Sequence, residues 1–366
     1  MIKKIFDPLD DESSVESRDL FLLCSDEKMK IEKIKGLMEK QADPNFKNQY
    51  SETTLHKVCA NKSVSLPIIK LLIEKKVDLE AKDSLGETAF CRACENKGIS
   101  EEIIRFLLEN KCDINFVGLN SVFNYICLKN FENFELIKLF VEYKADLNLI
   151  GHENKTPLQV LCCSGAQYHI IKYLIDQKSD LNLKSDFNQS SLQQYCSSKR
   201  VEVRVIEMLY LSDNNLNFKD DFGNTVLHCI SVSESLNFDS FKFLLEKKAD
   251  PGIEEENGIT PLEIVVDNNF VSEKTKNEIL HLLACYSPCT FLSVSLEDLI
   301  GYPVYLELAD LINKKSLWRK ETHKYFPSQM QTRIFYFLAC FKIFSLKLQA
   351  IFPKPLFILI INLSIS

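Results

Sequence analysis

The chain has 366 residues, of which 46% are hydrophobic and 26% are charged, a balance typical of globular proteins with a sizeable core. Its formal net charge of -7 and pI near 5.6 give no overall positive field for a phosphate backbone, so nucleic acid is not an expected partner. Thirteen cysteines in so long a chain indicate reduced thiols rather than a small disulfide scaffold.

The first 17 residues, MIKKIFDPLDDESSVES, contain an acidic stretch where a secretory signal needs an apolar core of roughly seven to fifteen residues. We therefore expect a flexible acidic N-terminal segment, residues 1–17. The same feature predicts a cytoplasmic protein, with the nucleus left open.

A phrase of about 14 residues recurs along the chain, and it defines a period. Examples are IIKLLIEKKVDLEA (68–81), IIRFLLENKCDINF (103–116), LIKLFVEYKADLNL (136–149) and IIKYLIDQKSDLNL (170–183). The acid or amide of this phrase recurs every 33 to 35 residues, at Asp43, Asp78, Asp113, Asp146, Asp180, Asn215 and Asp250. A second phrase precedes each copy, as TTLH (53–56), TPLQ (156–159), TVLH (225–228) and TPLE (260–263).

In order and spacing, these two phrases resemble the ankyrin repeat family, whose units open on Thr-Pro-Leu-His and close on Leu-Leu-x-x-Gly-Ala-Asp-x-Asn. The resemblance covers about eight units, residues 18–287. It implies an all-α repeat solenoid, in which helix-turn-helix units connected by hairpin loops stack upon each other. It also implies a non-catalytic scaffold or adaptor that binds a protein partner through a concave face formed by inner helices and hairpin tips.

The residues of each unit fit this architecture physically. Thr or Ser before the first helix can cap its free N–H groups, and a proline one residue later suits the first helical position. Apolar residues such as Ile103, Ile104 and Leu107 recur at helical spacing and would bury one face against the next unit. A small-residue position of the family is filled by cysteine here, at Cys24, Cys59, Cys94, Cys127, Cys162 and Cys196, which we interpret as buried packing residues.

No residue pattern indicates catalysis, a metal or a cofactor. His56 and His228 take the fourth place of the Thr-x-Leu-His phrase, where the family bonds the imidazole to neighbouring loop backbone. The pair Cys91 and Cys94 is spaced like half of a zinc site, but no matching second pair follows. Nucleophile-elbow, phosphate-loop and zinc-protease motifs are absent from the sequence, so we do not expect an enzyme.

One departure from the family concerns the glycine that ends the second helix in a left-handed conformation. This sequence has Gln41, Lys76, Lys111, Lys144, Lys178, Asn214 and Lys248 there. Keeping that geometry would cost up to about 1 kcal/mol per site. The hairpin glycine is better kept, as Gly86, Gly223 and Gly258, with Asn154 and Asn188 as substitutes. The unit around FVGLNSVF (116–123) is two residues short, so its hairpin is the least certain to follow the pattern.

The position before the hairpin glycine is apolar or aromatic in several units where the fold would expose it. It holds Tyr50, Leu85, Glu153, Phe187, Phe222 and Asn257. These side chains either bind a partner or pack on the adjacent hairpin to stiffen the row. Acidic residues lie close by, including Asp221 and Glu255, and they favour a basic partner segment. The candidate partner-binding residues are therefore Tyr50, Leu85, Phe187, Phe222, Asp221 and Glu255.

The remaining residues lack the repeat period. We expect capping helices or a linker over 288–315 and an apolar helical module over 316–366. The final run LFILIINLSIS has eleven residues, whereas a membrane crossing takes roughly 20, so a membrane contact is not expected.

The segment FPKPLFILIINLS (352–364) is similar to the opening of an F-box, with Phe352, Pro353, Leu356 and Ile360 in matching places. Pro355 stands where that motif has an acid, and the chain stops before its remaining helices. The resemblance implies an alternative function. In that alternative the chain is the substrate receptor of a ubiquitin ligase, and these four residues dock on a ligase adaptor.

Overall fold

The computed structural model describes residues 12–26, 29–211 and 215–286. Within these ranges the regular structure is helical, apart from two isolated bridges that join Lys82 to Thr88 and Val117 to Ser121. The chain divides into a first unit, residues 1–186, and a second unit, residues 187–366, each of which is described by itself.

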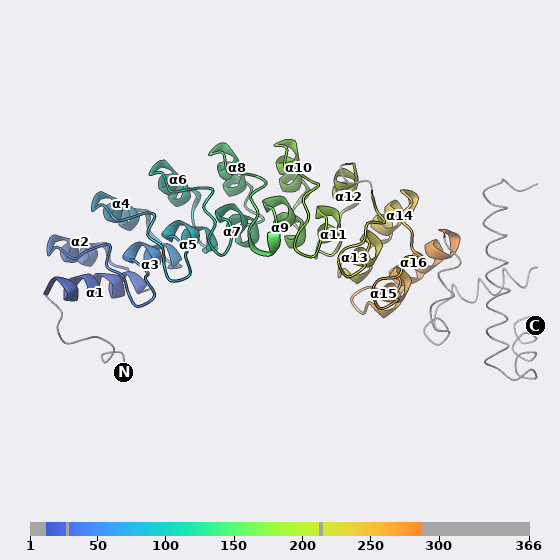
Figure 1. The fold of residues 1–366 in the computed structure, drawn as a ribbon, viewed down its shortest axis with the longest axis horizontal. Helices are drawn as coiled ribbons and strands as arrows, with labels where there is room; N and C mark the ends of the chain where they lie inside the picture. Colours follow the sequence, from blue (N-terminus) through green and yellow to red (C-terminus); the bar gives the residue numbers. More distant parts are fainter. Residues whose placement is uncertain (1–11, 27–28, 212–214, 287–366) are drawn as a thin grey trace, which may run out of the picture. The chain divides into compact units, whose positions relative to one another are not determined.

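The described part of the first unit contains five helix pairs, each with an inner helix followed by an outer one. Figure 1 shows its inner helices side by side in one row and its outer helices in a second row. The inner helices are α1 (Glu12–Ser25), α3 (Thr54–Ala60), α5 (Ala89–Glu95), α7 (Val122–Lys129) and α9 (Pro157–Ser164). The outer helices are α2 (Ile31–Glu39), α4 (Leu66–Glu74), α6 (Glu101–Glu109), α8 (Phe134–Glu142) and α10 (Tyr168–Asp176), and a short 3-10 helix, η1 (His152–Asn154), precedes α9.

The described part of the second unit repeats this plan three times. Its inner helices are α11 (Ser191–Cys196), α13 (Val226–Val232) and α15 (Pro261–Asp267), and its outer helices are α12 (Val203–Tyr210), α14 (Phe238–Glu246) and α16 (Glu273–Tyr286). Within each unit every inner helix contacts the next inner helix, as α11 contacts α13, and outer helices make similar contacts, as α12 does with α14 and α14 with α16. Each unit is thus a stack in which one pair covers the apolar face of the next.

The inner helices begin where the Thr or Ser of the repeated phrase predicts. Thr88 Oγ1 accepts the backbone N–H of Cys91, and Ser121 Oγ accepts that of Asn124. In α9 the side chains of Thr156 and Gln159 each accept the backbone N–H of the other residue, which forms a capping box. Each cap satisfies N–H groups that have no partner within the helix.

The cysteine position lies between stacked inner helices, as predicted. Cys24, Cys59, Cys94, Cys127, Cys162 and Cys196 are all fully buried and form no disulfide. Burial raises the pKa of the Cys24 thiol to about 12, and it raises the pKa of the Cys94 thiol in the same way. These thiols therefore stay protonated and pack as small apolar groups.

The second helix of each pair keeps the left-handed end even though the glycine is missing. Gln41, Lys76, Lys111, Lys144, Lys178 and Lys248 have φ between 61° and 71°, whereas Asn214 lies outside the described residues. After α4 the N–H of Lys76 bonds to the carbonyl of Ile73, and the N–H of Val77 bonds to that of Leu72. This hydrogen-bond pattern is the Schellman motif, so the backbone geometry is retained at the cost of strain.

The Asp-x-Asn phrase connects one repeat to the next. The carboxylate of Asp113 accepts the N–H of Asn115, and the side-chain oxygen of Asn115 accepts the N–H of Asp146 at 2.8 Å. Asn148 binds the N–H of Asp180 in the same way, and Asn217 binds that of Asp250 in the second unit. These bonds lie at exposed positions and recur between consecutive repeats, so the Asp-x-Asn sequence aligns one repeat with the next.

The first inner helix starts before residue 18, which is the residue where the sequence predicts the array to start. Helix α1 starts at Glu12, and Ser17 is buried with its hydroxyl accepting the N–H of Asp43 at 2.8 Å. Helix α1 lacks the Thr-x-Leu sequence that marks the later inner helices.

The predicted segments 288–315 and 316–366 lie outside the described residues, and so do the proposed docking residues Phe352, Pro353, Leu356 and Ile360. Among the residues that the structure describes, no helix has the length and apolar character needed to cross a membrane.

Candidate functional site

The candidate surface consists of hairpin tips between successive helix pairs. The first unit places Tyr50 and Leu85 on such tips with exposed fractions of 57% and 55%. The second unit places Phe187 and Phe222 there, with exposed fractions of 45% and 44%. Apolar side chains are therefore presented to solvent at the positions predicted from the sequence.

The tip of Tyr50 is held by the amide oxygen of Asn48, which accepts the N–H groups of Tyr50 and Glu52, and three other tips are held by a carboxylate of their own hairpin. Oδ1 of Asp83 accepts the N–H groups of Leu85 and Glu87, and Oδ1 of Asp220 accepts those of Phe222 and Asn224. Glu255, one of the predicted partner-binding residues, does the same for its own hairpin, because its Oε1 accepts the N–H groups of Asn257 and Ile259. The Oε2 of Glu255 also accepts the side-chain amide of Asn257, so both oxygens of this carboxylate serve the fold.

Adjacent hairpins are also bonded to each other through backbone groups. In the first unit the N–H of Ser84 donates to the carbonyl of Tyr50 at 2.8 Å. In the second unit the N–H of Asp221 donates to Phe187 O at 3.1 Å, and that of Glu256 donates to Phe222 O at 3.1 Å. Gly223, at φ +80°, lies so close to the next hairpin that an added Cβ would approach the backbone nitrogen of Glu256 to 2.9 Å. The tips are therefore ordered before any partner binds.

The two phenylalanines of the second unit contact each other and remain accessible. The ring centroids of Phe187 and Phe222 lie 5.3 Å apart, with an angle of 39° between the ring planes. Such pairs gain stability from ring contact, which accounts for part of their burial. About half of each side chain is still exposed, so packing on the neighbouring hairpin explains the arrangement only in part.

Exposed acids lie on the hairpin of Phe222 and on the hairpin that follows it. Asp221, Glu254 and Glu256 are exposed on the hairpins that carry Phe222 and follow it. The Nζ of Lys219 donates to the backbone carbonyl of Glu254 at 2.8 Å. We call Phe187, Phe222, Asp221, Glu254 and Glu256 the acidic aromatic tip.

The two histidines of the repeated phrase serve the fold, as predicted. Nδ1 of His56 accepts the N–H of Thr53 at 3.1 Å, so Nε2 carries the proton and donates to Glu87 O at 3.0 Å. His228 makes the equivalent bonds to Thr225 and Ile259. Burial lowers the pKa of both imidazoles and outweighs the opposing effect of their backbone hydrogen bonds.

Because of these lowered pKa values, stability should fall as the pH falls below about 6.5, the ordinary histidine value. Below that pH, His56 and His228 bind protons in the unfolded chain but stay neutral in the folded protein, which favours unfolding. Above it, both histidines are neutral in the folded and the unfolded state, so the full stability is present. The loss is at most about 1.4 kcal/mol per histidine and pH unit. It should appear as a lower melting temperature at pH 5.5 than at pH 7.5.

The chain supplies its own control for this experiment. Gln159 and Gln193 occupy the histidine position in other repeats and cap their helices with the same pattern of bonds. The double variant His56→Gln/His228→Gln should therefore remain folded and lose much of the difference between the two pH values. An unchanged difference would show that other groups cause it.

The shortened hairpin of residues 116–121 departs from the others, and a buried carboxylate completes it. Glu87 is 1% exposed, and its Oε1 accepts the N–H of Leu119 at 2.5 Å and the hydroxyl of Tyr125 at 3.2 Å. The absence of a side chain at Gly118 leaves room for the carboxylate of Glu87, because a Cβ added there would lie 2.6 Å from Oε1 of Glu87. Burial, reinforced by the neighbouring carboxylate, raises the pKa of Tyr125.

The sulfur pair that is spaced like half of a zinc site is buried. Cys91 and Cys94 are 1% and 0% exposed, and burial raises the pKa of Cys91 to about 12. No group of three or more His, Cys, Asp or Glu side chains suited to a metal ion occurs within the described ranges.

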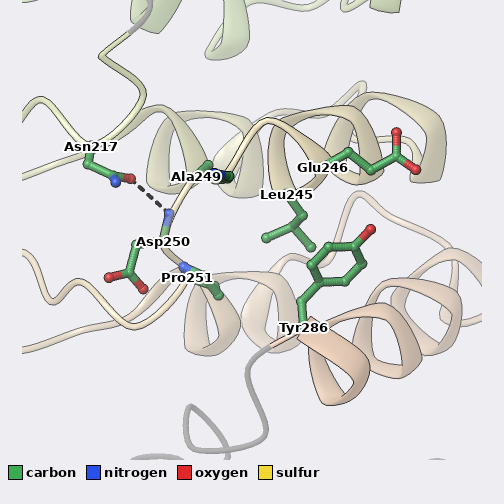
Figure 2. A pocket seen from close by; sticks show the side chains of 8 residues that line it. Asn217, Leu245, Glu246, Ala249, Asp250, Pro251 and Tyr286 are labelled. Atoms are coloured by element: carbon green, nitrogen blue, oxygen red, sulfur yellow. Dashed lines mark hydrogen bonds between the residues drawn. The ribbon is translucent and has the colours of Figure 1, made fainter. Parts of the chain in front are cut away.

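A pocket of about 610 Å³ lies in the second unit, between the end of α14, the loop after it and Tyr286 (Figure 2). Asn217, Glu246 and Asp250 are among the residues that line it. Figure 2 shows the bond from the N–H of Asp250 to Asn217, which belongs to the series that connects the repeats. The carboxylate of Asp250 accepts the N–H of Gly252, so these polar groups serve the fold.

Capped helix pairs, hairpin connections and bonds that repeat from unit to unit define a helical repeat solenoid. Residues 20–117 match the family model of ankyrin repeats (3 copies). A protein of Rickettsia felis (strain ATCC VR-1525 / URRWXCal2) named as an ankyrin repeat protein is 33% identical over 100 residues, which are 27% of this chain and 42% of that protein. Residues 20–117 are therefore similar to ankyrin repeats, and the helix pairs of the described residues have the all-α repeat fold. The chain spans less than half the length of this relative. Ankyrin repeats are generally protein-interaction modules, and the family is typically non-catalytic.

Proposed function

We propose that this protein is a non-catalytic scaffold or adaptor that binds a protein partner through its hairpin tips and the adjacent concave face of the inner helices. The observation that supports this proposal best is the exposure of Phe187 and Phe222 on a backbone fixed by its neighbours. Large aromatic side chains on a rigid support are the usual anchors of protein interfaces.

The other predicted contact residues fit this proposal to different degrees. Tyr50 and Leu85 are exposed on bonded hairpins of the first unit and extend the apolar surface there. Asp221 is exposed and available to a cationic group. The carboxylate of Glu255 is less available to a cationic group, because both of its oxygens bond to its own hairpin.

The buried thiols fit a reducing compartment, so we place the protein in the cytoplasm. Cysteines whose side chains the structure describes are free, and all of these but Cys163 are buried. A reducing compartment maintains such thiols without further protection.

The test is affinity capture with the full chain as bait, followed by measurement of the affinity of the partner that it retains. The variant Phe187→Ser/Phe222→Ser should weaken that partner about tenfold or more, because interface anchors contribute on this scale. Far-ultraviolet circular dichroism checks that the variant is folded.

The matched control replaces exposed apolar residues that lie away from the hairpin tips of the same unit. Leu211 and Phe270 are 83% and 72% exposed, so Leu211→Ser/Phe270→Ser removes comparable apolar surface. This variant should keep the affinity of the wild type. Full binding by the tip variant, or loss of binding in the control, would contradict the proposed surface.

A further inference from the structure

The acidic aromatic tip has a surplus of negative charge that the fold does not use. Asp221, Glu254 and Glu256 are exposed, and none of their carboxylates is needed to close a hairpin turn, unlike those of Asp220 and Glu255. Lys219 lies two residues before Asp221, and its ammonium group donates to the backbone carbonyl of Glu254. The tip therefore has free carboxylates beside two half-exposed aromatic rings.

This combination defines the chemistry of the group that it can bind. A cationic side chain can place its charge near the carboxylates and its apolar stem or guanidinium plane on a phenylalanine ring. A tryptophan can add ring contact to Phe187 and Phe222, which already lie 5.3 Å apart. An anionic segment would meet repulsion at the same place.

We propose that the acidic aromatic tip binds a basic segment of this same chain, residues 314–324, with the sequence KKSLWRKETHK. The segment lies outside the described residues, and the proposal rests on its composition. It holds five lysine and arginine residues against one acid, and Trp318, the single tryptophan of the protein, is at its centre. Its charge and its aromatic residue thus complement those of the tip.

The connecting chain is long enough for this contact. Residues 287–313 provide 27 residues between Tyr286 and the segment, and such a chain can span up to about 90 Å when extended. Helices pack at roughly 10 Å from each other, so a stack of three helix pairs extends over only about 30 Å. Every hairpin of the second unit is therefore within reach.

The contact would regulate binding, and in this respect the inference depends on the proposed function. A segment of the same chain occupies the tip at a high effective concentration, so a protein partner must displace it. Any modification or partner that removes positive charge from 314–324 would then expose Phe187 and Phe222.

Trp318 makes the contact measurable in the full chain, without a label and without the partner. In wild type its fluorescence should be protected from acrylamide, and raising NaCl from low concentration to about 1 M should increase the quenching constant about twofold, because salt screens exposed charge pairs. The variants Asp221→Lys/Glu256→Lys and Lys315→Glu/Arg319→Glu should each show the quenching of the high-salt state at low salt.

Combining both pairs of substitutions reverses the charges on both sides and should restore the protection of Trp318. The control variant Glu109→Lys/Glu132→Lys makes the same charge change at exposed positions of the first unit and should quench like wild type. Quenching that is insensitive to salt and to the tip variants would overturn the proposal. So would protection that rises with protein concentration, because it would indicate binding between two copies.

These measurements separate the two proposals. If substitutions in the tip reduce the protection of Trp318 but do not change the affinity of the partner, the internal contact is supported and the proposed binding surface is rejected. If replacing Phe187 and Phe222 weakens the partner but the quenching of Trp318 does not depend on the tip, the binding surface is supported and the internal contact is rejected.

Discussion

Replacing Glu87 by alanine is expected to lower the free energy of unfolding by about 2–4 kcal/mol, a large effect for a residue outside the apolar core. Alanine would leave two polar groups without their partner, the N–H of Leu119 and the hydroxyl of Tyr125, which both donate to Oε1 of Glu87. A buried group that loses its acceptor costs about 1–3 kcal/mol. Denaturant unfolding followed by circular dichroism measures the loss.

A glutamine at position 87 provides the matched control for this prediction. It keeps an oxygen in the place of Oε1 and has nearly the same volume, so Glu87→Gln should retain most of the stability. If the alanine variant were as stable as the glutamine variant, the carboxylate would not be holding the shortened hairpin. Gly118→Ala should destabilise the same hairpin by a separate route, because its Cβ would meet the side chain of Glu87 at 2.6 Å.

Much of the fold could be predicted because each repeated residue has a local physical role. The Thr or Ser cap fixes the start of an inner helix, and the buried cysteine position fixes the face against which the next helix packs. These roles need only neighbours at a constant distance along the sequence, so the period reveals them. The predictions for His56 and His228 were confirmed for the same reason.

The role of Glu87 could not be predicted, because it depends on the two-residue shortening of the hairpin after α6, which differs from the other repeats. Sequence comparison among the repeats shows that the hairpin after α6 is two residues short, but it does not show which side chain fills the space. The filling residue lies 32 positions before the N–H that it binds. The sequence also cannot state how far Phe187 and Phe222 bury each other, since that depends on the distance between their hairpins.

The left-handed lysines offer a route to a more stable protein. The variant with glycine at Lys76, Lys111, Lys144 and Lys178 should be more stable than wild type by about 2 kcal/mol. The left-handed backbone costs a non-glycine residue about 1 kcal/mol, so relieving it at four sites gains about 4 kcal/mol, and the greater freedom of glycine in the unfolded chain offsets about half of that gain. A shift of the denaturation midpoint to higher denaturant, measured against wild type at the same salt concentration, tests this result.

The charge of these lysines acts in the opposite direction and must be separated from the strain. A cation near the end of a helix interacts with its carbonyl groups and contributes about 0.3–1 kcal/mol at low salt. Replacing the same four lysines by glutamine removes the charge and keeps the Cβ, as the chain itself does at Gln41 with φ of 67°. The glutamine variant should be equal to or less stable than wild type, while the gain from glycine should grow as salt screens the lysine charges. Equal stabilisation by glutamine and glycine would mean that repulsion among the lysines, and not the left-handed backbone, limits the stability of the array.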